Sequence, residues 1–107
     1  MKNLDDIKND IVIDWIFGEL RKAESKHPGW PTDPIHAAAI LAEESGELVQ
    51  ACIDYVYNDE DGEKAVIEAA QCGAMAIRFL LNVGNYERSK APQKLKTAEP
   101  ICHGPAN

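Results

Sequence analysis

Apolar residues recur along the first quarter of the chain at the three- and four-residue spacing of a helix. The stripe consists of Leu4, Ile7, Ile11, Trp15, Leu20 and Ala23. It predicts a helix over about residues 4–25, with one face turned to a core. Residues 27–31 contain two prolines and a glycine, which cannot continue a helix.

A second helix is predicted to begin after this break. Thr32 or Asp33 provides a capping side chain, and Pro34 suits the first turn, where its missing N–H has no partner to lose. The helical pattern then continues to about Tyr57.

Residues 58–62 form a polar turn, and their acidic side chains suit the start of a third helix. That helix is predicted to run from about Glu63 to Asn82, with Gly84 as its C-cap. Residues 86–107 are rich in lysine and proline and show little periodicity, so we expect an extended or docked tail. No segment shows strand-like alternation. The predicted fold class is therefore all-α, a hairpin-based bundle of three long helices over about residues 1–85.

Two acidic clusters lie on the second and third predicted helices. Glu43, Glu44 and Glu47 fall within an arc of about 100° on one helix, and Glu68 and Gln71 share a face of the other. Glu47 is about as far before the turn as Glu68 is after it, so an antiparallel hairpin places them at one height. Three carboxylates and one amide would then converge, a donor set that suits Mg²⁺ or Mn²⁺ better than zinc.

Length and charge restrict the remaining possibilities. The 107 residues predict a single domain over 1–107, and 45% of them are hydrophobic. So short a chain buries only about two-thirds of its surface alone. We therefore expect a homodimer or a dimer of dimers with a four-helix core. A net charge of −7 argues against nucleic acid as a partner, although metal ions could bridge the chain to a phosphorylated small molecule.

The three cysteines are odd in number and lack metal-site spacing. Cys52 and Cys72 fall within helical patterns, which predicts buried free thiols in a reducing cytoplasm. The sequence has neither a signal peptide pattern nor an apolar run long enough to span a membrane, so we expect no membrane association.

The two acidic clusters together resemble the MazG-like all-α nucleoside triphosphate pyrophosphohydrolases, over roughly residues 30–83. The resemblance implies a helical dimer or tetramer that uses Mg²⁺ to hydrolyse a nucleoside triphosphate to monophosphate and pyrophosphate. By position, Glu44, Glu47 and Glu68 match metal ligands of that family, and Glu43 matches a residue that activates water.

The chain departs from the family pattern at Gln71, where an aspartate is usual. An amide oxygen can ligate Mg²⁺ but brings no negative charge. With this departure, the resemblance implies a slower enzyme, an enzyme with altered substrate choice, or a non-catalytic relative of the family. In the last case it would be a metal- or nucleotide-binding helical oligomer with a regulatory role.

Further polar residues on the same helix faces are candidates for substrate binding. These are His36, Asp54, Lys64, Arg78 and Asn82. For His36 the competing interpretation is a capping or solvent-facing histidine, and for Arg78 and Asn82 it is ordinary surface polarity. The two tryptophans, Trp15 and Trp30, are expected in the core and at a helix entry rather than as platforms for a base.

Overall fold

The computed structural model describes residues 3–88, which form three long helices and one short turn of 3₁₀ helix. Helix α1 spans Leu4–Lys26, α2 spans Pro34–Tyr57 and α3 spans Glu63–Leu81, and η1 covers Val83–Asn85. No strand occurs among the described residues. The prediction of an all-α fold is therefore confirmed.

The ends of the helices follow from local hydrogen bonding. Asp33 caps α2, because its Oδ1 accepts a hydrogen bond from the Ile35 N–H at 2.9 Å. Helix α3 ends at Leu81, within one residue of the predicted end, with Asn82 as its C-cap. The choice of Gly84 as the cap was wrong, since the chain has already tightened into η1 at that position.

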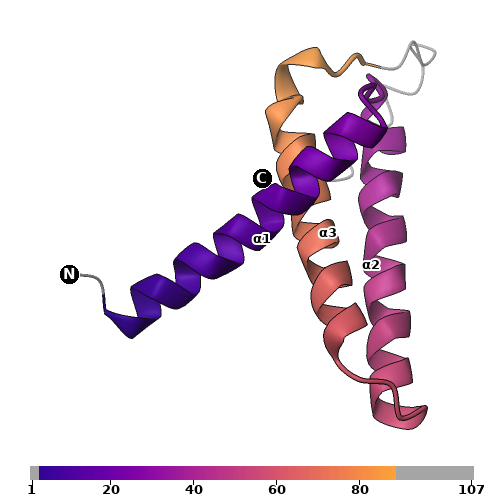
Figure 1. Ribbon diagram of the computed structural model, residues 1–107. Helices are drawn as coiled ribbons and strands as arrows, with labels where there is room; N and C mark the ends of the chain where they lie inside the picture. Colours follow the sequence, from indigo (N-terminus) through magenta and orange to yellow (C-terminus); the bar gives the residue numbers. More distant parts are fainter. Residues whose placement is uncertain (1–2, 89–107) are drawn as a thin grey trace, which may run out of the picture.

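Helices α2 and α3 form an antiparallel hairpin, and α1 crosses α3 obliquely (Figure 1). The connection between α2 and α3 is the acidic turn. In it Asp59 takes a left-handed conformation with φ of 61°, which aspartate tolerates better than most residues. Asp61 accepts a hydrogen bond from the Glu63 N–H at 3.0 Å, just before Gly62, the N-cap of α3.

Small residues on α3 allow α1 to approach closely. A Cβ atom at Gly73 would lie 3.3 Å from Ile16 Cδ1, and Ala70 and Ala74 are buried nearby. The core is centred on Leu20, Ala74 and Met75. Residues packed against this centre are Ile16, Ala23, Trp30, Ile40, Leu41 and Ile77. The core therefore joins the C-terminal half of α1 to the hairpin, while the N-terminal half of α1 projects away from it (Figure 1).

The segment after η1 returns to the loop between α1 and α2. The indole N–H of Trp30 donates to Tyr86 Oη at 2.9 Å, and that hydroxyl donates to the Phe79 carbonyl at 2.9 Å. The Glu87 N–H donates to the Thr32 carbonyl at 2.9 Å. The first residues of the predicted tail are thus docked, and residues 89–107 lie outside the described part of the chain.

Much apolar surface stays uncovered. Trp15 is 52% exposed, so its expected core position is wrong: it borders an open groove between α1 and α3. Cys52 is free but exposed rather than buried, and Cys72 is half-buried. An open apolar groove of about 350 Å³ runs between α1 and α3, lined by Val12, Trp15, Ile16, Val66, Ala69 and Ala70. Among the described helices, none combines the length and apolar character needed to cross a bilayer.

Candidate functional site

Three carboxylates from the hairpin meet at one point. Glu44 and Glu47 are neighbours on one face of α2, since residues three apart lie about one turn apart. Glu68 faces them from α3. One carboxylate oxygen from each of the three residues lies within 4.8 Å of the others. The antiparallel hairpin thus places these side chains at a common height.

The electrostatics of this cluster are unfavourable for three ionised groups. Burial is the main cause that raises the pKa of Glu44, and the charges of Glu47, Glu68 and Glu43 raise it further. Burial likewise raises the pKa of Glu68, followed by the nearby Glu47 carboxylate, while Lys64 opposes the shift. One oxygen of Glu44 and one of Glu68 are buried without a hydrogen-bond partner among the described residues.

These features fit a divalent cation. A buried oxygen without a partner is costly, and a hard cation would give such an oxygen a partner and offset the repulsion between carboxylates. Opposite ligands of an octahedral Mg²⁺ lie about 4.2 Å apart, and the three oxygens of the cluster all lie within 4.8 Å of one another, so one ion could contact all three after small side-chain adjustments. The donors are all oxygens, so Mg²⁺ and Mn²⁺ match them better than zinc does.

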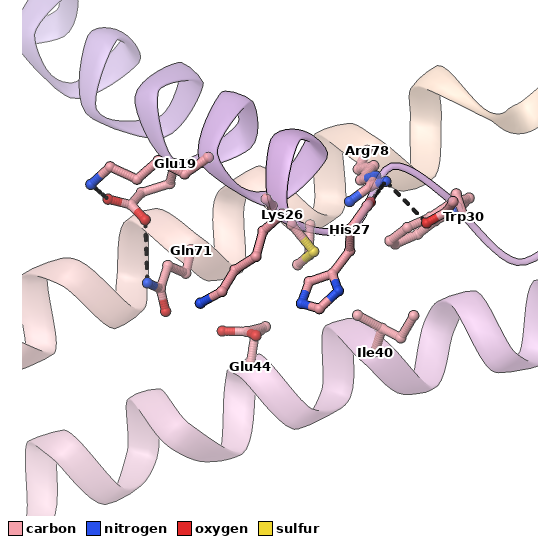
Figure 2. A pocket seen from close by; sticks show the side chains of 12 residues that line it. Glu19, Lys26, His27, Trp30, Ile40, Glu44, Gln71 and Arg78 are labelled. Carbon is pink, nitrogen blue, oxygen red and sulfur yellow. Dashed lines mark hydrogen bonds and ion pairs between the residues drawn. The ribbon is translucent and has the colours of Figure 1, made fainter.

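A pocket of about 410 Å³ adjoins the cluster and is shared by all three helices (Figure 2). Its polar side carries carboxylate, amide, ammonium and imidazole groups, and its apolar side holds an indole, an isoleucine and a methionine. The lining residues are Glu19, Lys22, Ala23, Lys26, His27, Gly29, Trp30, Ile40, Glu44, Gln71, Met75 and Arg78. A pocket of this size and mixed lining is typical of small-ligand sites.

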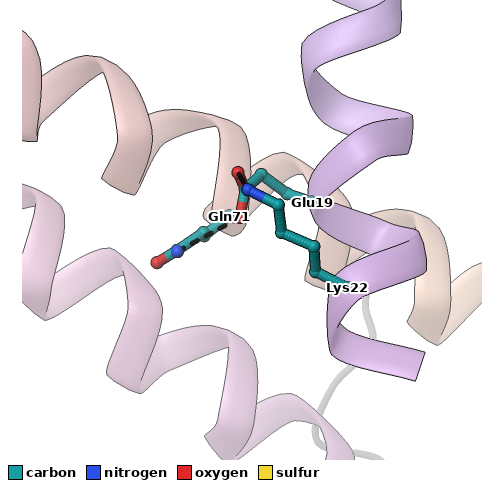
Figure 3. A network of polar contacts seen from close by, with 3 residues as sticks. All are labelled: Glu19, Lys22 and Gln71. Carbon is teal, nitrogen blue, oxygen red and sulfur yellow. Dashed lines mark hydrogen bonds and ion pairs between the residues drawn. The ribbon is translucent and has the colours of Figure 1, made fainter. Parts of the chain in front are cut away.

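Gln71 connects the pocket to α1. Its Nε2 donates to Glu19 Oε1 at 3.2 Å, and the other oxygen of Glu19 pairs with Lys22 at 3.2 Å (Figure 3). Glu19 is 16% exposed and Lys22 is 76% exposed. The Glu19 carboxylate is therefore held between two donors at the wall of the pocket. The exposed lysine contributes less to holding it than the half-buried amide does, because solvent screens an exposed ion pair.

Arg78 lines the pocket but is engaged with the chain itself. The side chain is 4% exposed, and its Nη2 donates to the carbonyl oxygens of His27 at 2.6 Å and Gly29 at 3.1 Å. Its guanidinium also lies 4.9 Å from the centre of the Trp30 ring. This arginine fixes the loop between α1 and α2, which forms one wall of the pocket.

Four other residues predicted to bind substrate lie outside the pocket lining. His36 is exposed in the first turn of α2, and Lys64 is exposed one turn before Glu68. Asp54, near the end of α2, accepts hydrogen bonds from Gln50 and Asn58.

The fourth is Asn82, which donates to the Arg78 carbonyl at the end of α3. Glu43, the predicted water-activating residue, is exposed on α2. It is close enough to Glu44 to influence that residue's pKa.

The contribution of α1 to the pocket is absent from the sequence predictions. Glu19, Lys22 and Lys26 follow one another at spacings of three and four, so they share one face of a helix. This pattern was readable in the sequence. What could not be read was that the C-terminal half of α1 lies beside the acidic cluster.

Comparison with known proteins leaves the site to be interpreted from its own geometry. No family model matches the chain, and neither a curated protein nor a solved structure matches it.

Proposed function

We propose that this protein is a Mg²⁺-dependent nucleotide pyrophosphohydrolase, which cleaves a nucleoside triphosphate to a monophosphate and pyrophosphate. The observation that carries the proposal is the convergence of Glu44, Glu47 and Glu68, with two buried oxygens lacking partners, beside a pocket of about 410 Å³. The resemblance of the acidic motifs to the MazG-like family supports the same reaction. Mn²⁺ is the natural substitute ion.

The carboxylates of Glu44, Glu47 and Glu68 would hold the cation. When bound, the ion supplies neutralisation of phosphate charge and a water of lowered pKa. Glu43 is the proposed proton acceptor, since it is exposed next to Glu44 and its charge reaches that residue.

The pocket offers different partners to the two ends of a nucleotide. The Lys26 side chain extends toward Glu44 in Figure 2, and Lys22 lines the same pocket; ammonium groups of this kind suit phosphate oxygens. Trp30, Ile40 and Met75 provide apolar surface against which a base can pack. The orientation proposed here therefore places the phosphate chain at the carboxylates and the base toward the loop after α1.

Product analysis tests the reaction. A panel of nucleoside triphosphates is incubated with the protein and Mg²⁺ or Mn²⁺, and pyrophosphate and monophosphate are separated by ion-exchange chromatography. We expect equimolar pyrophosphate and monophosphate from the wild type, and loss of both with Glu47→Gln. Glu63→Gln on the exposed first turn of α3 is the matched control. Release of inorganic phosphate with a diphosphate product would contradict the proposal.

A second function is favoured by the hydrogen bond between Gln71 and Glu19. This bond ties up the amide at the position where the family pattern has an aspartate. In that alternative the protein binds a metal or nucleotide without turnover and acts as a regulatory helical oligomer. Activity of the wild type and of Gln71→Asp separates the two: turnover by the wild type excludes the alternative, whereas turnover only by Gln71→Asp favours it.

The active form is proposed to be a homodimer or a dimer of dimers. Exposed apolar side chains lie on all three helices, among them Trp15 on α1, Val49 on α2 and Val66 on α3. Uncovered apolar surface on this scale is typical of an interface. A four-helix core built from α2 and α3 of two chains would cover part of it.

A further inference from the structure

The hydrogen bond between α1 and α3 determines which atom Gln71 presents to the acidic cluster. Glu19 is a carboxylate and accepts hydrogen bonds only, so the amide must turn its nitrogen toward Glu19. Its oxygen is then directed away from Glu19. Figure 2 shows this oxygen on the side facing α2, where Glu44 stands. The hydrogen bond consequently holds Gln71 with its amide oxygen directed into the pocket, where the oxygen can act as a metal ligand.

The carboxylate of Glu19 also places a negative charge near the cluster. It lines the same pocket as Glu44, and one of its oxygens accepts the hydrogen bond from Gln71 at 3.2 Å. Helix α3 carries an amide at Gln71, where a carboxylate would complete a four-carboxylate set. The nearest replacement for that charge comes from α1, across 52 positions of the chain.

From this arrangement we infer that Glu19 is a positioning residue of the cation site: it fixes the orientation of the Gln71 amide and supplies the fourth negative charge. The inference rests on the proposed function, because it assigns α1 a role in the same cation site. Replacing a residue that orients the ligands of a metal typically weakens the protein's affinity for that metal by about ten- to a hundredfold. Together, Glu19 on α1 and Gln71 on α3 would therefore provide the negative charge and the oxygen ligand that a single carboxylate would otherwise provide.

The test is a set of Mn²⁺ titrations by isothermal calorimetry on the full chain. Glu19→Gln keeps the length of the side chain and its ability to hydrogen-bond with Gln71, but removes the charge and the constraint on the amide. We expect Mn²⁺ to bind about tenfold more weakly. Glu24→Gln removes the same charge from an exposed position of α1 outside the pocket, and should bind as the wild type does.

A double variant that exchanges the side chains of Glu19 and Gln71 tests whether the effect is specific to this pair. Glu19→Gln combined with Gln71→Glu retains one carboxylate and one amide, exchanged between the two helices, and should restore Mn²⁺ affinity to at least the wild-type value. Circular dichroism confirms that each variant keeps its helices. The inference is overturned if Glu19→Gln binds Mn²⁺ like Glu24→Gln, or if the double variant fails to restore a lost affinity. A wild type that binds no Mn²⁺ overturns both the proposed function and this inference. A wild type that binds Mn²⁺ no more tightly than Glu19→Gln overturns the inference alone.

Discussion

Glu44 on α2 and Glu68 on α3 bring carboxylate oxygens within 4.8 Å of each other, and each residue has a buried oxygen without a hydrogen-bond partner among residues 3–88. Two half-buried acids in such contact oppose folding unless a proton or a cation joins them. This relationship makes the stability of the protein depend on pH and on divalent ions in ways that can be measured.

The metal-free protein should lose stability as pH rises through the acid range. The pKa values of Glu44 and Glu68 are raised in the folded chain above the ordinary 4.5, mainly by burial. The folded state therefore holds protons more tightly than the unfolded state. The stabilisation from these protons is fully present below pH 4.5 and disappears as pH rises through the folded pKa values.

Melting temperatures in EDTA, measured from pH 4.5 to 7.5, check this effect. Glu68→Gln cannot ionise, so its melting temperature should fall less than that of the wild type over the same interval. Glu63→Gln, on the exposed first turn of α3, should follow the wild type. An equal fall in the wild type and Glu68→Gln would show that the carboxylate contact has no effect on stability.

Arg78 should be important for stability rather than for direct substrate contact. Arg78→Met leaves the carbonyls of His27 and Gly29 without their donor and removes the guanidinium beside Trp30. We expect the free energy of unfolding to fall by about 3 kcal/mol, as measured by urea denaturation. Asn85→Ala, at an exposed position of η1, serves as a control. A loss below about 1 kcal/mol for Arg78→Met would contradict this role.

Oligomer formation should depend on the apolar groove between α1 and α3. Replacing Trp15 or Val66 by lysine puts a charge on surface that the protomer itself leaves exposed. Light scattering should give the wild type a mass two or four times 11.8 kDa, and the lysine variants a smaller assembly. Ile35→Lys changes an apolar residue that is exposed at the start of α2, outside the groove, and is the control. A wild type that stays at 11.8 kDa at micromolar concentration would refute the dimer.

The hairpin could be predicted because the sequence features that define it lie close together in the chain. Apolar spacing predicts α2 and α3, and their polar connection makes them antiparallel. Equal counts from the turn then place Glu47 level with Glu68. Each step needs only residues close together in sequence, so the acidic cluster could be located without knowledge of the packing.

The role of α1 could not be predicted in the same way. Its path includes a close contact between Ile16 and Gly73, residues far apart in sequence, which a Cβ atom at position 73 would crowd. That path leaves Trp15 exposed and brings Glu19 to Gln71. The burial of Arg78 likewise depends on loop carbonyls that only the folded chain brings near it. Helical periodicity predicts none of these contacts.

The most direct test of the cation site is the thermal response to Mn²⁺ at neutral pH. A ligand that binds only the folded state raises the melting temperature in proportion to the logarithm of its concentration once its site is saturated. We predict such a rise for the wild type and for Glu63→Gln, and none for Glu47→Gln or Glu68→Gln. Without metal, Glu47→Gln and Glu68→Gln should melt at the same temperature as the wild type or slightly higher, since repulsion is relieved. An identical response to Mn²⁺ in all four proteins would contradict the site.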